Sequence, residues 1–299
     1  MKKIIIFVLC ALVFFGCKQQ PIDGPEGDRD IVVFFSSQYI LTSTLKSAAS
    51  ENEKLINKVV LFGFDASDNF VINSKWVISN PFLSGQKITA ISKNVKTIWA
   101  IANPTVEMES TIPVNVSALK ALTKDYPENS PPNTQFLMSG KGTVNDYSVT
   151  IPLYFAVAKV EIIPDGFTIT SVEVKNTLNR VFVFDENLFN GAPLSIPLVP
   201  SGAGVSRVNY ASPSSQPDPL VFYVAENNAT NTDNSTKFMI SGTVEGMPVI
   251  DYKLELILDG SIIPIRRNTH YTVKISPTDG TVIISVPGWT DQPTQGHTF

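Results

Sequence analysis

Short runs of β-forming residues recur along the whole chain, and they limit its fold more than any other feature of the sequence. Each run is rich in Val, Ile, Phe, Tyr and Thr and is bounded by Gly, Pro, Asn or Asp, as strands joined by turns are. Within residues 171–175 and 251–258 charged and apolar residues alternate, so one face of those strands should lie in water. The predicted strands are residues 31–35, 59–64, 97–102, 136–139, 148–153, 158–163, 169–174, 181–184, 221–225, 238–244, 252–258, 270–275 and 282–286. This pattern predicts an all-β fold.

One helix signal interrupts the β pattern, at residues 117–124. Ser117 can cap its first turn, and Leu119 and Leu122 stand three apart on one side. Ahead of it, residues 43–58 are polar and rich in small side chains, which favours an exposed loop over a core element. We therefore expect one short helix in the first part of the chain and a protease-accessible loop after the first strand.

The two cysteines of the chain, Cys10 and Cys17, both lie within an N-terminal export signal. Two lysines precede about twelve apolar residues, and the small Gly16 stands immediately before Cys17. This is the order that a signal peptidase requires when it cuts before a lipidated cysteine. A transmembrane helix is the alternative, but it needs about twenty apolar residues. We expect residues 1–16 to be a lipoprotein signal peptide and Cys17 to carry the lipid that anchors the protein to a membrane.

The composition of the mature chain agrees with export. Removal of the two signal lysines leaves 21 basic residues against 27 acidic ones, a net charge of −6, and no basic run is longer than Arg266-Arg267. Nucleic acid is therefore not an expected partner. The mature chain has no second cysteine to pair with Cys17, so its stability must come from packing. Residues 17–30, with their prolines, glycines and mixed charges, are predicted to form a flexible tether.

A faint internal repeat divides the remaining chain into two parts. Residues 99–103, followed by the Ser-Gly segment 136–144, are echoed by residues 223–227 and the Ser-Gly segment 238–244. In each part a strand ends in a polar turn, and a later strand carries Ser-Gly. Two similar β-sandwich domains are the simplest explanation, and we place them at residues 31–155 and 156–299.

The same segments, in this order, resemble the fimbrillins, which are lipoprotein precursors of type V pili in Bacteroidetes-type bacteria. The resemblance implies two tandem transthyretin-like β-sandwich domains with a short helix in the first, and a small accessory or tip-like subunit. Within this family Arg267, Asn268 and Tyr271 match an Arg-Asn-x-x-Tyr stretch with a structural role, in which Asn makes a turn and Tyr packs at the sandwich edge. Phe155 stands where the family usually has an arginine. The segments are residues 100–104, 117–123, 136–140, 151–162, 265–275 and 282–289.

The resemblance also implies a mechanism, polymerisation by strand exchange. The family's precursor crosses to the outer membrane and cell surface, a trypsin-like protease cuts beyond the first strand, and a neighbour's C-terminal strand fills the groove that is left. Such a groove exposes unpaired backbone groups and apolar pockets, and an incoming strand satisfies both. The candidate removable first strand comprises Ile31, Val32, Val33, Phe34 and Phe35. The candidate donor strand comprises Val282, Ile283, Ile284, Val286 and Trp289.

Basic residues near the first strand leave the processing site open. No arginine lies between Arg29 and Arg180, so the loop after the strand offers Lys46, Lys54 and Lys58. A cut after Arg29 would remove the tether and spare the strand. The candidate processing sites are therefore Lys46 and Arg29, with a different protease or no cut at all as alternatives. An uncut chain would be an anchor or a tip-like accessory subunit, with other fimbrial subunits and a host or bacterial surface ligand as expected partners.

Catalytic motifs are weak in this sequence. Its two histidines, His270 and His297, are poor members of a Ser-His-Asp triad, and there is no Cys/His metal spacing or Gly-rich phosphate loop. We interpret the carboxylate pairs as parts of solvated turns rather than as catalytic acids. We interpret residues 227–234 as an exposed polar turn rather than a calcium site. We predict no enzymatic activity, cofactor or metal.

The alternative function is a surface lipoprotein that binds a glycan or host protein without polymerising. That function would need exposed aromatic side chains. Trp76 and Trp289 stand beside polar turns, whereas Trp99 lies in an apolar strand and is predicted to be core.

Overall fold

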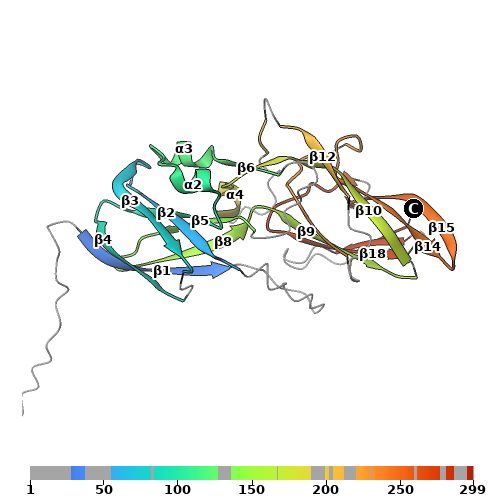
Figure 1. The fold of residues 1–299 in the computed structure, drawn as a ribbon, viewed down its shortest axis with the longest axis horizontal. Helices are drawn as coiled ribbons and strands as arrows, with labels where there is room; N and C mark the ends of the chain where they lie inside the picture. The colour runs from blue at the N-terminus through green and yellow to red at the C-terminus, as the bar shows by residue number, and fades with distance from the viewer. Residues whose placement is uncertain are drawn as a thin grey trace, which may run out of the picture.

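A computed structural model describes residues 28–37, 55–81, 84–126, 136–166, 168–189, 199–201, 205–211, 220–229, 231–258, 261–276, 281–285 and 295–298. Strands dominate this part of the chain, and the all-β fold is confirmed. The sheets fall into two groups that follow one another along the longest axis of the molecule (Figure 1). We call the group built up to Phe155 the N-terminal half and the group built from Ala158 the C-terminal half.

Seven strands of the N-terminal half form one sheet, in the order β3-β2-β5-β7-β8-β1-β4. They are β1 (Asp28–Ser37), β2 (Lys58–Phe64), β3 (Phe70–Ser79), β4 (Gln86–Ser92), β5 (Thr97–Ala102), β7 (Met138–Thr143) and β8 (Ser148–Phe155). The expected strands at residues 31–35, 59–64, 97–102 and 148–153 are thereby confirmed, whereas β3 and β4 were not predicted.

Two glycines allow this sheet to fold over on itself between β7 and β8. These strands pair only at Met138 and Ser139, beyond which β8 crosses β7 at close range. A Cβ atom on Gly140 would lie 1.9 Å from the carbonyl oxygen of Pro152, and one on Gly142 would lie 2.4 Å from that of Thr150. Because no other residue fits at either position, the Ser-Gly segment marks the line along which β8, β1 and β4 turn back over β2, β5 and β7.

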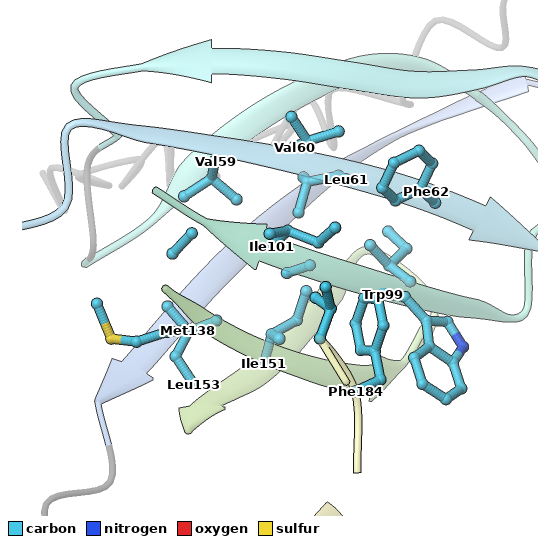
Figure 2. Close-up of a cluster of buried hydrophobic side chains, with 14 of the residues drawn as sticks. Val59, Val60, Leu61, Phe62, Trp99, Ile101, Met138, Ile151, Leu153 and Phe184 are labelled. Atoms are coloured by element: carbon cyan, nitrogen blue, oxygen red, sulfur yellow. The ribbon is translucent and has the colours of Figure 1, made fainter. Parts of the chain in front are cut away.

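The core of the N-terminal half centres on β2, which is buried on both faces. Every residue from Val59 to Phe64 is buried, and Val59 and Val60 lie on opposite sides of the strand (Figure 2). On one face Phe62 pairs with Trp99 of β5, and the Trp99 ring meets Phe184 edge-on at 5.2 Å. The continuous apolar run in the sequence follows from this two-sided burial.

The described part of the chain contains three short helices, α2 (Val106–Ser110), α3 (Val116–Lys120) and α4 (Glu186–Phe189). The expected helix is α3, but it is capped by Asn115, whose Oδ1 accepts a hydrogen bond from the Ala118 N–H at 2.8 Å, and not by Ser117. It also ends earlier than predicted, because Thr123–Asp125 pairs as strand β6 with a later segment. None of the described helices is long and apolar enough to cross a membrane.

The C-terminal half consists of two facing sheets. One has the order β12-β10-β14-β15 and the other β13-β9-β18-β19-β20, and apolar residues of both sheets form a second core between them. The strands are β9 (Ala158–Pro164), β10 (Thr168–Leu178), β12 (Arg207–Ala211), β13 (Leu220–Val224), β14 (Lys237–Val244), β15 (Met247–Glu255), β18 (His270–Ser276), β19 (Thr281–Ser285) and β20 (Gln295–Thr298). A separate small ladder pairs β16 (Ile257–Leu258) with β17 (Ser261–Ile262).

The two halves share a packed junction. Strand β11 (Arg180–Phe182) follows β10 and pairs with β6. Arg180 forms a bidentate ion pair with the Asp125 carboxylate there, from Nε at 2.5 Å and from Nη2 at 2.9 Å. Val183 and Phe184 continue from β11 into the N-terminal core. The boundary proposed between residues 155 and 156 thus falls between β8 and β9, and the halves it separates are held together by this junction.

Candidate functional site

The candidate first strand, β1, lies inside its sheet with a strand on each side. Residues 28–33 pair antiparallel with β4, and residues 32–37 pair parallel with β8. Both edges of β1 are therefore used, and its removal would leave an open slot lined by the backbone of β4 and β8.

Side chains of β1 alternate between the core and the surface. Ile31, Val33 and Phe35 are 1%, 0% and 7% exposed, whereas Val32 is half-buried and Phe34 is 38% exposed. All five candidate residues therefore lie in one strand, and three of them fill apolar pockets. The strand begins at Asp28 rather than at Ile31, so the last three residues of the predicted tether belong to it.

Polar side chains fix the beginning of β1. The Arg29 guanidinium donates from Nη2 to the Val95 carbonyl oxygen at 3.0 Å. The Asp30 carboxylate lies 2.9 Å from Lys87 Nζ and accepts a hydrogen bond from the Ala90 N–H at 3.2 Å. The hydrogen bond from Lys87, followed by that from Ala90, lowers the pKa of Asp30. Arg29, a candidate processing site, is thus part of a paired strand, while Lys46 lies outside the described residues.

The candidate donor residues lie at the far end of the other half. Val282, Ile283 and Ile284 belong to β19, which pairs antiparallel with β18 of the same molecule and with the short β20. Val286 and Trp289 lie outside the described residues, as do Cys17 and the signal peptide. In this structure the candidate donor strand is therefore paired within its own chain.

The Arg-Asn-x-x-Tyr stretch lies at the junction of the two halves. Arg267 is buried against Glu226, with Nη2 2.5 Å from the Glu226 carboxylate and Nη1 3.3 Å from the Val183 carbonyl oxygen. Burial raises the pKa of Glu226, and Arg267 opposes that shift. Asn268 adopts a positive φ of 53°, as its expected turn requires. These contacts give the stretch a structural role.

Tyr271 does not pack at the sandwich edge as expected. It is 1% exposed in the C-terminal core, where its hydroxyl donates to the Pro264 carbonyl oxygen and accepts from the Arg266 N–H. Burial raises its pKa to about 12. The tyrosine is buried because its hydroxyl finds both partners inside the fold.

Phe155 fills the position at which the family resemblance expects an arginine. Its ring is buried and meets Phe136 edge-on at 6.0 Å, and its N–H donates to Asn268 Oδ1 at 3.1 Å. The backbone at this point is thus tied to the second half without a charged side chain, and a ring occupies the apolar space.

Two candidates for catalysis, His270 and the Asp65 member of a carboxylate pair, have structural partners. His270 Nε2 lies 2.9 Å from the Glu161 carboxylate, and the described residues contain no group of three His, Cys, Asp or Glu side chains that could hold a metal ion. Asp65 accepts hydrogen bonds from two backbone N–H groups of its own turn. Asn227 is buried and donates to the carbonyl oxygens of Asn176 and Asn234, so the 227–234 segment is not simply an exposed turn.

The described tryptophans do not form an exposed row. Trp99 is 3% exposed, which confirms it as core, and Trp76 is half-buried against the same core. Trp99 borders a cleft of about 310 Å³ that Phe189, Glu186 and Lys141 also line, with Lys141 Nζ 5.4 Å from the centre of the Trp99 ring. Trp289 lies outside the described residues.

Solved structures of other proteins share the fold of this chain over nearly their whole length. A candidate cell adhesion protein from Bacteroides eggerthii DSM 20697 matches with a TM-score of 0.59 at 16% identity, covering 88% of this chain and 96% of its own. The tip fimbrial protein Mfa3 from Porphyromonas gingivalis, with a C-terminal truncation, matches at 0.55 and 16% identity, covering 87% and 100%. A fimbrial assembly protein from Parabacteroides distasonis ATCC 8503 matches at 0.55 and 14% identity, covering 90% and 99%.

The fold is thus one that bacterial fimbrial and adhesion proteins adopt. The family model of the fimbrillin-A associated anchor proteins Mfa1 and Mfa2 matches residues 27–292, and the chain belongs to that family. A search of functionally curated proteins found no match. The predicted resemblance to fimbrial proteins is therefore confirmed.

Proposed function

We propose that this protein is a lipid-anchored fimbrial component of the outer membrane and cell surface, which joins other fimbrial subunits by strand exchange and contributes to adhesion. Membership of a family of fimbrillin-associated anchor proteins supports the fimbrial role. The observation that carries the proposal is the placement of β1, which fills a slot between β4 and β8 with three buried apolar side chains. The role is structural and needs no catalytic residue.

Within this scheme we favour the uncut chain, which acts as an anchor. While β1 occupies its slot, the N-terminal half cannot accept a strand from a neighbour, because the backbone groups of β4 and β8 are already paired. The C-terminal hairpin, β19 with β20, is then the part available for exchange. A subunit of this kind donates a strand and accepts none, which suits one end of a polymer.

The anchor is tested at Cys17. Cys17→Ala should abolish incorporation of a radioactive fatty acid, because no other cysteine remains in the mature chain. N-terminal analysis of the surface protein should show an acylated Cys17. Label in the mutant would refute lipid attachment at Cys17, and an N-terminus at Ser47 would show instead that the chain is cut after Lys46.

Donation is tested with a peptide of residues 282–290. It should bind a fimbrial subunit of the same organism whose first strand has been removed, and it should not bind that subunit before removal. A peptide with Ile283 and Ile284 changed to Asn serves as the control. Equal binding of the two peptides would show that the apolar side chains do not recognise the groove.

A further inference from the structure

The first residues of β1 are attached to a rigid part of the N-terminal half. Arg29 donates to the carbonyl oxygen of Val95, which follows β4. The Val95 side chain is fully buried, and its N–H donates to the Ser92 carbonyl oxygen. A Cβ atom on Gly63 of β2 would lie 3.0 Å from a Val95 methyl group, so Val95 is packed tightly against the central strand. Arg29 therefore connects β1 to a tightly packed residue of the N-terminal half.

Asp30 holds an irregularity in the ladder between β1 and β4. The register shifts between Arg29 and Ile31, and Ala90 on β4 adopts a positive φ of 55°. A left-handed conformation is unfavourable for a residue with a Cβ. The Asp30 side chain accepts a hydrogen bond from the Ala90 N–H at 3.2 Å and pairs with Lys87 at 2.9 Å. It therefore stabilises the irregular backbone at this point of the ladder.

These contacts lie at the end of β1 that faces the lipid. On the proposed function, Cys17 is held in the membrane and the chain runs from it directly into Asp28. A force between membrane and fimbrium would therefore act on the N-terminal end of β1. Peeling the strand from that end must break the Arg29 and Asp30 contacts before it reaches the apolar pockets of Ile31 and Val33.

We propose that Arg29 and Asp30 form a clasp that holds the N-terminal end of β1 in its slot when the lipid is pulled. The clasp acts in the uncut chain, and cutting the chain after β1 makes its strength measurable. This inference rests on the proposed function for its biological meaning. The retention of β1 by these two side chains can be measured on the soluble protein, without a membrane or a partner subunit. Arg29 is then a positioning residue and not a processing site.

The test uses the soluble mature chain, with an affinity tag in place of the lipid at residue 17 and a site for a specific protease inserted after Lys46. After complete cutting, the protein is held on affinity resin through the tag, and release of the C-terminal fragment is followed over time. The wild-type fragment should stay bound, because β1 remains in its slot. Arg29→Ala with Asp30→Ala should speed release at least ten-fold.

Matched variants separate the clasp from a general effect on the strand. Asp28→Ala changes a neighbouring residue of β1 for which the described chain supplies no side-chain partner, and it should leave release unchanged. Asp30→Asn keeps an oxygen for the Ala90 N–H but loses the exposed ion pair, so it should have a smaller effect than Asp30→Ala. Circular dichroism of the uncut proteins confirms that each variant folds. If the double variant does not fold, Arg29→Lys and Asp30→Asn are compared instead.

Rapid release of the wild-type fragment, or equal release from wild type and the double variant, would overturn the clasp. Neither result would affect the proposed function, because fatty-acid labelling at Cys17 and binding of the 282–290 peptide are measured on different preparations. Conversely, loss of lipid labelling would remove the anchor and leave the release assay unchanged.

Discussion

The first and the last strands of this chain are attached to it in different ways. β1 lies between β4 and β8 and pairs with both, whereas among the described strands the hairpin of β19 and β20 joins the rest of its sheet through β18 alone. To remove β1, two ladders must open and three buried side chains must enter water. To remove the hairpin, one ladder must open. The comparison shows that the rest of the chain holds the first strand along more of its backbone than it holds the terminal hairpin.

Deletion of β1 should have the largest effect on stability. Without residues 18–37 the pockets of Ile31, Val33 and Phe35 are empty, a loss of about 5–9 kcal/mol as an upper bound. The N-terminal half of the shortened chain should unfold at a much lower urea concentration than the N-terminal half of the full chain. A peptide of residues 28–37 should restore its stability. Deletion of residues 18–27 is the control and should leave the urea midpoint unchanged. A stable chain without β1 would remove the basis of the comparison.

Deletion of residues 281–299 should have a smaller effect, confined to the C-terminal half. The protein should remain a folded monomer, because β19 of the hairpin pairs with β18 in the sheet of the C-terminal half. It should also fail to join surface polymers, as measured by size analysis of sheared fimbriae. If the truncated protein assembles normally, donation by the hairpin is wrong; if the whole molecule unfolds, the hairpin is not the loosely held element.

Substitutions within β1 should follow the alternation of its side chains. Ile31→Ala removes a buried side chain and should lower the free energy of unfolding by about 2–5 kcal/mol. Val32→Ala, at the neighbouring half-buried position, should lower it by less than about 1 kcal/mol. Chemical denaturation measures both. An equal loss of stability in the two variants would mean that both faces of β1 are buried to the same extent.

Acid should weaken the hold on β1 slightly. The folded pKa of Asp30 lies below its ordinary value of 3.8, so its contribution is present above that value and is lost as the pH falls through the folded pKa. In the cut protein, release should therefore quicken below about pH 4, and Asp30→Asn should remove part of this dependence. An identical pH profile for both proteins would show that Asp30 does not hold the strand.

Sequence patterns predicted strands that are buried on both faces better than strands with irregular backbones. β2 and β5 read as continuous apolar runs, because neither has a face in water. β3 and β4 were missed, since Asn73 and Ala90 adopt positive φ angles and interrupt the alternation of side chains. Nothing in the residues near those two positions distinguishes a kinked strand from a loop.

The candidate site was predicted in part for the same reason. The residues of β1 could be named, because their apolar run is local. Their partners could not, since β1 pairs with β4 and with the distant β8, and such pairing depends on the whole fold. The contact of Arg29 with Val95 and that of Arg267 with Glu226 join residues far apart in sequence, and in each case the sequence showed only a basic residue beside a predicted strand.

The parallel pairing of β1 with β8 also fixes an order of events during biogenesis. β1 precedes the other described strands along the chain, yet one of its two partners, Ser148–Phe155, follows only after the other strands of its sheet. Contacts of such wide sequence separation form slowly, because a long stretch of chain must close before they are made. β1 therefore stays unpaired on that side until β8 has taken its place in the sheet.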